Sequence, residues 1–245
     1  TAIISKALAN SIANTAIHHD LTQPVNAMEY SIDNEPVIIA SPVYYGRIPV
    51  VAKERIQMIN GNGNHAIVIV VFGNRHYDDA LLELKTLAEE QGFKVIAAAA
   101  FIGEHSFSSD VYPIAPHRPD AHDLDAADAF GKKILQKLQN SDKNYPTLNV
   151  PGNNPYKEIP SFQDVMPETI TEKCSGCGLC ANVCPVNALH INGSVITDPK
   201  TCIYCCACVK MCPQQARTAT NPFFTASREK LHNFCSDRKE PEIFL

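Results

Sequence analysis

Short apolar runs alternate with amphipathic segments along the first 140 residues of the chain. Unbroken apolar and β-branched residues predict buried strands at residues 37–40, 66–72 and 95–101, with a shorter candidate strand at 16–21. Apolar residues at helical spacing predict helices over residues 2–14, 49–59, 78–91 and 123–138. Strands that alternate with helices in this way are typical of a doubly wound parallel sheet.

Three loops that follow predicted strands combine glycine, aromatic and polar residues. They cover residues 41–49, 73–79 and 103–108. Because ligands of such sheets bind beyond the carboxyl ends of the strands, the loops are candidates for a site that takes a planar, hydrogen-bonding ligand. Ordinary turn residues would give a similar composition, so the loops alone leave both interpretations open.

The alternation of apolar runs and amphipathic segments ends near residue 140. Prolines without a periodic apolar pattern predict an extended connector; they stand at Pro146, Pro151, Pro155, Pro160 and Pro167. A last segment has apolar residues near helical spacing, at Phe223, Phe224, Leu231 and Phe234. We expect it to cover an apolar face of the molecule; docking a partner is the alternative.

Eight of the ten cysteines repeat the spacing C-x2-C-x2-C-x3-C-P. The second copy begins 28 residues after the first, from Cys174 to Cys202. Three cysteines two residues apart can surround a compact cluster, whereas the fourth enters a helix that leads to the other cluster. The pattern therefore predicts two [4Fe-4S] clusters, one held by Cys174, Cys177, Cys180 and Cys212, and the other by Cys202, Cys205, Cys208 and Cys184.

Other uses of the cysteines fit this spacing less well. Structural zinc sites have four ligands in two separated pairs, and disulfides need an oxidising compartment. Between the two copies, residues 191–195 contain Asn-Gly and predict a tight hairpin. The sequence thus predicts that residues 174–212 form one small unit that folds around both clusters.

Two positions of the second copy depart from the first. Cys206 replaces Gly178, and we expect a small buried side chain beside the cluster, with a ligand swap with Cys205 as the alternative. Tyr204 replaces Gly176, and we expect it to shield its cluster from water, so that the two potentials differ. Cys235 lies outside the pattern and is expected to be a free buried cysteine.

Composition excludes several classes of protein. The chain has 245 residues, enough for two domains, and its net charge of −5 without a long basic run disfavours nucleic-acid binding. No apolar stretch is long enough to cross a bilayer, and no signal peptide is visible. Unpaired thiols indicate a reducing cytoplasm. We find no nucleophile–base pair and no nicotinamide fingerprint, and we assign no catalytic residue.

Four segments resemble the EFR-type flavodoxin–ferredoxin fusion proteins of anaerobes: SPVYYGRIP, the stretch that begins VVFGNRHYDD, the linker VPGNNPYKE and the closing RKEPEIFL. The resemblance runs through nearly the whole chain. It implies a flavodoxin-like α/β domain over residues 1–140, a proline-rich linker over 141–167, a small α+β two-[4Fe-4S] ferredoxin domain over 168–221, and a C-terminal packing or docking segment over 222–245.

The resemblance also implies an FMN site. It assigns to the flavin the loop residues Pro42, Val43, Tyr44, Tyr45 and Gly46, together with Gly73, Asn74, Arg75 and Tyr77. Tyr44 or Tyr45 would lie against one face of the isoalloxazine ring and Tyr77 against the other.

The start of a flavodoxin-like sheet is missing from this chain. Such sheets begin with a central strand, and the loop after it binds the FMN phosphate at a helix N-terminus. The chain begins at that helix, so we expect the strand and most of the loop to lie upstream, with Thr1 as the last residue of the phosphate loop.

These features favour an electron-transfer protein that passes electrons between redox partner proteins in anaerobic metabolism. One alternative is a flavin-dependent oxidoreductase with its own small substrate. Another is the electron-input subunit of a larger redox complex, in which the flavodoxin domain has lost FMN and only docks.

Overall fold

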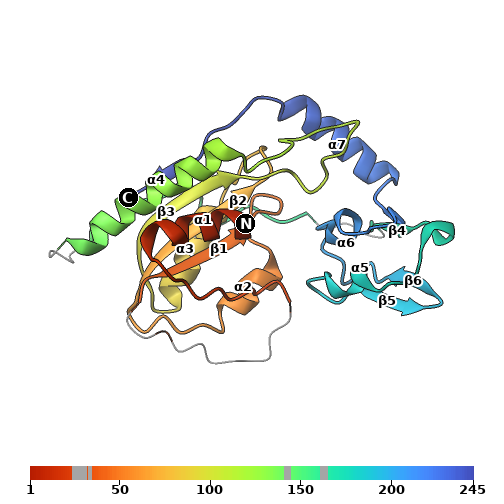
Figure 1. Cartoon of the computed structure of the whole chain (residues 1–245). Helices are drawn as coiled ribbons and strands as arrows, with labels where there is room; N and C mark the ends of the chain where they lie inside the picture. The colour runs from red at the N-terminus through yellow and green to blue at the C-terminus, as the bar shows by residue number, and fades with distance from the viewer. Residues whose placement is uncertain (24–31, 33–34, 141–144, 161–164) are drawn as a thin grey trace.

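A computed structural model describes residues 1–23, 32, 35–140, 145–160 and 165–245. Two parts lie side by side in Figure 1: an α/β part built around a parallel sheet, and a smaller cysteine-rich part. The C-terminal segment runs over both of them. Among the described residues, no helix has the length and apolar character that crossing a membrane requires.

The main sheet has the strand order β1-β2-β3-β8. Its first three strands, β1 (Val37–Pro42), β2 (His65–Phe72) and β3 (Lys94–Ile102), run parallel. Nearly every residue of β2 and β3 is buried, which explains why their sequences are continuous apolar runs. The short β8 (Glu242–Phe244) pairs with β3 in the antiparallel direction.

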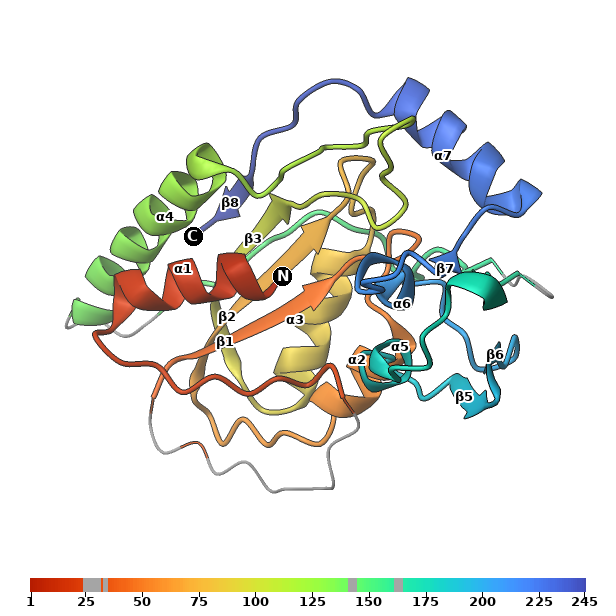
Figure 2. The same cartoon turned by 45° about the vertical axis from the view of Figure 1, so that its right-hand side comes forward.

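Helices cover both faces of the sheet (Figure 2). On one face, α1 (Ala2–Ile12) packs against α4 (Ala121–Gln139), and their apolar sides meet Ile67 and Ile69 of β2. Gly131 permits this close contact, because a Cβ there would lie 2.5 Å from the Cβ of Ser11. On the other face, α3 (Ala80–Glu90) packs against Val68 and Val70, beside α2 (Val50–Ile56).

The structure confirms most of the elements expected in this part. Strands form at the three long apolar runs, and helices form at the four amphipathic segments, with ends that differ by up to three residues from those expected. The expected strand at residues 16–21 is wrong: the backbone there is irregular and mostly exposed, and within the described residues no strand pairs with it. Its apolar residues alone cannot make a strand without a neighbouring ladder.

The cysteine-rich part consists of short elements that leave long loops around the cysteines. In chain order they are β4 (Glu168–Thr169), η1 (Thr171–Lys173), α5 (Leu179–Asn182), β5 (Leu189–Asn192), β6 (Ser194–Thr197), α6 (Ala207–Lys210) and β7 (Arg217–Thr218). β5 and β6 form the expected hairpin, which turns at Gly193 with a φ of 68°. β4 and β7 pair in the antiparallel direction and bring the two ends of this part together.

After the cysteine-rich part, the chain returns to the main sheet. Asn221 caps α7 (Pro222–Phe234) by accepting a hydrogen bond from the N–H of Phe224, and Pro222 occupies the first turn, where it is tolerated. Phe224 is fully buried in an apolar cluster with Phe107 and Cys206. This cluster therefore joins α7, a loop of the α/β part and a cysteine loop.

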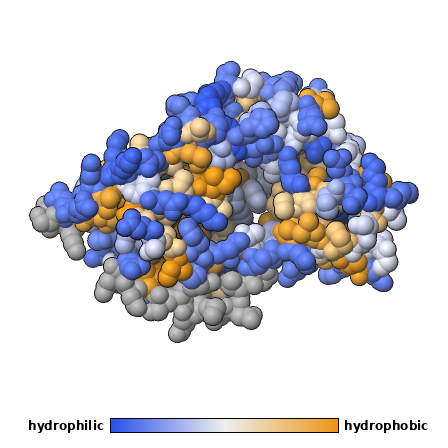
Figure 3. Space-filling model, in the orientation of Figure 1, coloured by the Kyte–Doolittle hydropathy of each residue, from blue (hydrophilic) through white to orange (hydrophobic). Residues whose placement is uncertain are grey.

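The outer surface is mainly hydrophilic, with apolar patches on both parts (Figure 3). On the cysteine-rich part, Ile191 and Ile196 of the hairpin are about half exposed, at 48% and 55%. Single exposed apolar residues of this kind are common on soluble domains and need no partner to explain them.

Candidate functional site

The structure brings the eight repeated cysteines together around two pockets. The first pocket is lined by Cys174, Cys177, Cys180 and Cys212, and the second by Cys184, Cys202, Cys205 and Cys208. These are the two crossed groups that the spacing led us to expect. The unfilled space at each pocket, open solvent at its mouth included, is about 330 Å³ for the first and about 320 Å³ for the second.

Each cysteine loop wraps around its pocket because two of its residues have a left-handed backbone conformation. In the first copy these are Gly176 and Gly178, with φ of 69° and 78°; in the second they are Tyr204 and Cys206, with φ of 59° and 58°. Only glycine adopts this conformation without strain, so the second loop keeps the same path at a cost in conformational energy. A short helix begins after each loop and directs the fourth cysteine toward the other pocket.

Main-chain N–H groups point at the sulfurs of both fourth cysteines. The N–H of Ala188 donates to Cys184 Sγ at 3.3 Å, and the N–H of Ala216 donates to Cys212 Sγ at 3.2 Å. Burial acts against the thiolate of Cys212, but N–H groups, that of Ala216 among them, outweigh it and lower the pKa. These donors favour the anionic sulfur that metals bind.

The donor set and its surroundings fit an iron–sulfur cluster. Burial raises the pKa of Cys205 to about 12, so a thiolate there requires a cationic metal centre as compensation. Within the described residues, no three His, Cys, Asp or Glu side chains converge closely enough to hold a single metal ion. The spaced thiols around each pocket are instead suited to a larger group that reaches all four.

Arg217 adds a buried positive charge to the wall of the first pocket. Its guanidinium is almost fully buried, and its Nε has no hydrogen-bond partner among the described residues. A buried cation with an unpartnered donor fits an anionic group such as a thiolate-ligated cluster.

The remaining cysteines and Tyr204 lie where apolar packing accounts for them. Cys206 lines the second pocket and packs in the cluster of Phe107 and Phe224, and Tyr204 packs against the same cluster. Cys235 is buried at the end of α7. All ten cysteines lie in the described part of the chain, and none forms a disulfide.

The loops of the α/β part converge at the carboxyl edge of its strands. The N–H of Asp79 donates to the carbonyl oxygen of Gly46 at 3.0 Å, which joins the first loop to the second. A Cβ at Gly46 would collide with Asp78, and a Cβ at Gly73 would collide with His105 of the third loop. Glycine is therefore required for the three loops to meet.

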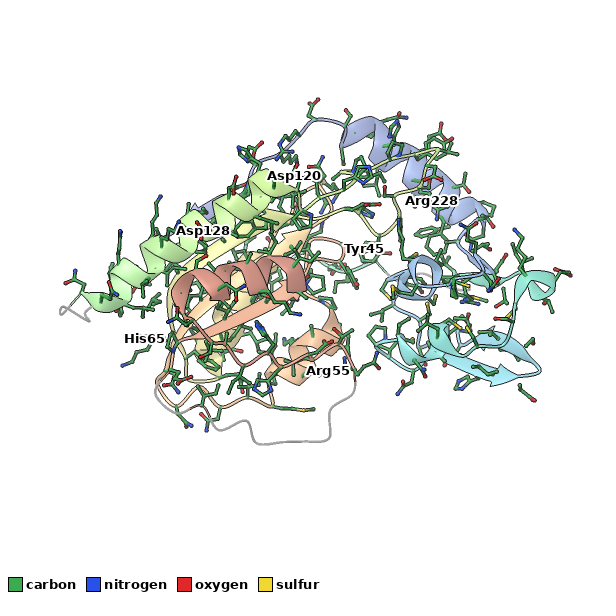
Figure 4. All side chains as sticks on the ribbon, in the orientation of Figure 1. Tyr45, Arg55, His65, Asp120, Asp128 and Arg228 are labelled. Atoms are coloured by element: carbon green, nitrogen blue, oxygen red, sulfur yellow. The ribbon has the colours of Figure 1, made fainter. Side chains whose placement is uncertain are left out.

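The first of these loops lies against the second cysteine loop. Burial raises the pKa of Tyr44, with Cys205 and Cys206 adding to the shift. Burial also raises the pKa of Tyr45 to about 12, with Tyr204 and Cys206 contributing. Figure 4 shows Tyr45 between the sheet and the sulfurs of the cysteine-rich part. The edge at which ligands of parallel sheets bind thus faces the second pocket.

The other residues of the expected FMN site lie in different surroundings. Pro42 ends β1, and the N–H of Val43 extends its ladder by donating to Val71. Arg75 is exposed and forms an ion pair with Asp78. Thr1 is the N-cap residue of α1.

Asn74 and Tyr77 both contact the C-terminal segment. Asn74 is 1% exposed, and its side-chain N–H groups donate to the carbonyl oxygens of Cys235 and Asp237 at 2.7 and 2.9 Å. Tyr77 is equally buried in the core, with its hydroxyl 2.7 Å from Glu242 Oε2. The structure therefore does not bring Tyr77 to the surface where Tyr44 and Tyr45 lie, because its ring fills a core position beside Phe72.

Polar contacts fix the cysteine-rich part on the α/β part. Lys210 of α6 donates to the carbonyl oxygen of Ser108 at 2.8 Å. Arg228 of α7, labelled in Figure 4, donates to the carbonyl oxygens of Phe107 and Ala219 at 2.8 and 2.6 Å. These bonds hold the second cysteine loop beside the third loop of the α/β part.

Comparison with known proteins identifies the cysteine-rich part. The family model of the 4Fe-4S binding domain matches the chain twice, at residues 167–190 and 195–218. A ferredoxin of Methanothermococcus thermolithotrophicus is 37% identical over 51 residues, which cover 19% of this chain and 85% of that ferredoxin. Each of the two model matches contains one of the two cysteine repeats, and together they support the [4Fe-4S] clusters expected in this part of the chain.

Proposed function

The chain belongs to the ferredoxin family through its cysteine-rich part, and we propose that it is an electron-transfer protein that joins two [4Fe-4S] clusters to a flavin-binding domain. An iron–sulfur electron-transfer role follows from the family itself. The number of clusters, their ligands and the flavin are our proposal. The observation that most directly supports a flavin site joined to the clusters is that the loop with Tyr44 and Tyr45 lies against the second cysteine loop.

We assign each cluster to the four cysteines around one pocket. Cys174, Cys177, Cys180 and Cys212 hold the first cluster, and Cys202, Cys205, Cys208 and Cys184 hold the second. Support comes from the grouping of the cysteines and from the N–H groups at Cys184 and Cys212. Cys206 is not a ligand in this proposal, because its side chain packs in the apolar cluster with Phe107.

The α/β part takes FMN in the manner of a flavodoxin-like domain. Pro42, Val43, Tyr44, Tyr45 and Gly46 form one wall of the ring site, and Gly73, Asn74 and Arg75 form another. The Oδ1 atom of Asn74 is buried and accepts no hydrogen bond from the described residues, which suits the N–H of an isoalloxazine ring. Thr1 would face the phosphate from the N-terminus of α1, where the helix dipole favours an anion.

Tyr77 has a structural role in this arrangement. Its ring lies in the core and its hydroxyl bonds to Glu242 of β8, so it positions the second loop and does not stack on the flavin. Tyr44 and Tyr45 remain as the stacking residues. Both are close enough to the second cysteine loop for its side chains to shift their pKa values, and their rings would exclude water between the flavin and the second cluster.

The placement of the loops supports an order of electron transfer that belongs to this proposal. FMN exchanges one or two electrons and each cluster exchanges one. The second cluster lies on the inner side, against Tyr44 and Tyr45, whereas Cys177 of the first cluster is exposed. Electrons would therefore pass between the flavin site and the surface around Cys177, where a redox partner protein docks.

Iron, sulfide and flavin analysis of the anaerobically purified full-length protein tests this function. We expect two four-iron clusters and one FMN per chain. Clusters without flavin after acid extraction and chromatography would favour the docking alternative, in which Tyr44 and Tyr45 only hold the two parts together. Steady turnover of a small-molecule acceptor by the isolated protein would favour the enzyme.

A further inference from the structure

A buried guanidinium lies between the two cysteine pockets. Arg217 of β7 is 3% exposed. It lines the first pocket, and its Nη2 is 3.7 Å from the sulfur of Cys208, which belongs to the second. A single side chain therefore contacts the surroundings of both proposed clusters.

Among the described residues, the oxygen atoms that accept hydrogen bonds from this guanidinium are all neutral. Nη1 donates to Thr169 Oγ1 at 2.6 Å, and Nη2 donates to Thr197 Oγ1 and to the carbonyl oxygen of Pro167, both at 2.8 Å. The two threonine hydroxyls donate in turn to main-chain carbonyl oxygens, so their lone pairs are directed at the guanidinium. These three oxygen acceptors fix the position of Arg217 and contribute no negative charge, so among its described partners the sulfur of Cys208 is the one that could carry one.

This leaves the charge of Arg217 without a balancing carboxylate. In the part of the chain that the structure describes, no ion pair includes Arg217, and its Nε has no partner. An arginine stays protonated in proteins, and burying its charge without an anion is costly. The thiolates of the two pockets are the nearby groups that can balance it.

The first repeat shows that the fold does not need an arginine here. Arg217 follows Cys212 at the same distance as Leu189 follows Cys184. Leu189 is also buried, beside its own pocket. An apolar side chain therefore satisfies the packing of this position, and the charge is an addition of the second repeat.

We propose that Arg217 is a shared counter-charge that raises the reduction potentials of both clusters; this inference rests on the proposed function. When a cluster accepts one electron from a redox partner, it gains one negative charge, and no bond or proton is exchanged. A fixed cation beside it stabilises the reduced form more than the oxidised form. Arg217 lines the pocket of the first cluster, and its Nη2 is 3.7 Å from the sulfur of Cys208, a proposed ligand of the second.

Three substitutions in the full-length protein separate charge from packing. Arg217→Leu restores the residue of the first repeat, Arg217→Gln keeps hydrogen-bonding groups without charge, and Arg217→Lys keeps the charge without the planar donors. Lys133→Leu makes the same change of net charge on the exposed surface of α4 and serves as the control. Each protein is analysed for iron and sulfide, and its cluster potentials are measured by EPR-monitored potentiometry.

We expect the Leu and Gln variants to keep both clusters and to show lower potentials by at least about 59 mV, a tenfold change in a one-electron equilibrium. The Lys variant and the control should stay near the unaltered protein. If Arg217→Leu loses iron, the comparison of Gln with Lys decides. Unchanged potentials, or equal shifts in the Gln and Lys variants, would show that the charge of Arg217 does not set the cluster potentials. The proposed electron-transfer function would not be affected by that result. Absence of clusters from the unaltered protein would instead overturn the proposed function, and this role with it.

Discussion

Arg55 Nη2 donates a 2.6 Å hydrogen bond to the carbonyl oxygen of Pro185, the residue that follows Cys184. Arg55 belongs to α2, and its Nη1 also binds the carbonyl oxygens of Leu21 and Thr22. One buried side chain of the α/β part, labelled in Figure 4, therefore supports the main chain beside a proposed ligand of the second cluster.

Replacing Arg55 with Met should loosen this junction. Methionine keeps most of the apolar stem but leaves the carbonyl oxygens of Pro185, Leu21 and Thr22 without their donor. The loss of the buried bond to Pro185 by itself costs about 1–3 kcal/mol in free energy of unfolding. Urea denaturation measures the change. Gln57→Ala, at an exposed position at the end of the same helix, should change stability by less than about 0.5 kcal/mol. Equal effects of the two substitutions would show that the hydrogen bonds of Arg55, that to Pro185 included, do not stabilise the folded protein.

Cys205 and Cys206 should respond differently to substitution. Cys205→Ala removes a proposed ligand, so we expect the second cluster to be lost or converted to a three-iron form. Cys206→Ala removes only a buried side chain from the apolar cluster with Phe107, so both clusters should remain. Iron content and EPR spectra distinguish the two results. Loss of iron from the Cys206 variant, with iron retained in the Cys205 variant, would establish the ligand swap.

Gly46 and Gly63 form a matched pair for testing loop convergence. Both have left-handed backbone, with φ of 80° and 78°, so alanine at either position costs about 1 kcal/mol or more in backbone strain. A methyl at Gly46 also collides with Asp78, whereas a methyl at Gly63 meets no atom within 4 Å. Gly46→Ala should therefore be clearly more destabilising in urea and should release flavin. Indistinguishable variants would argue against close contact between the first two loops.

Stability should fall at acidic pH because of His105. Burial, with Arg75 and Lys210 adding to it, lowers the pKa of this histidine to about 4. The unfolded chain binds the proton near pH 6.5, before the folded protein does, so protons favour unfolding in the window from about 6.5 down to about 4. The loss amounts to roughly 3 kcal/mol across that window.

The variant His105→Gln isolates this contribution. Glutamine can still accept a hydrogen bond, as Nδ1 does from the N–H of Phe107, but it does not titrate. The difference in unfolding free energy between the variant and the unaltered protein should therefore narrow as the pH falls through the window. A difference that stays constant with pH would mean that His105 is protonated equally in both states.

Local patterns in the sequence predicted the elements that form from neighbouring residues. The cysteine spacing predicted the grouping around the two pockets, because the loop and the short helix that follows it fix where each sulfur points. The apolar runs predicted β1, β2 and β3, since strands buried on both faces leave no polar positions to obscure the pattern.

Features that depend on distant parts of the chain were not predictable in this way. The three residues of β8 are too few for a periodic signal, and they form a strand only because β3 offers a free edge. Tyr77 belongs to a loop rich in polar residues, and its ring packs in the core while its hydroxyl bonds to Glu242, far along the chain. Arg217 stands five residues after Cys212, outside the C-x2-C-x2-C-x3-C-P spacing, so the cysteine pattern carries no signal for it. Comparing the two repeats position by position would have shown an arginine aligned with Leu189.

The place of β8 has a consequence for the order in which the protein is made. A ribosome that has synthesised Glu242–Phe244 has already synthesised both cysteine repeats. The edge of β3 therefore receives this strand only after the metal-binding segment has emerged, and the carbonyl groups of Cys235 and Asp237 reach Asn74 equally late. During translation, the α/β part therefore lacks β8 at a stage when both cysteine repeats have already been synthesised. The cysteines can then receive iron–sulfur clusters before the main sheet has its four described strands.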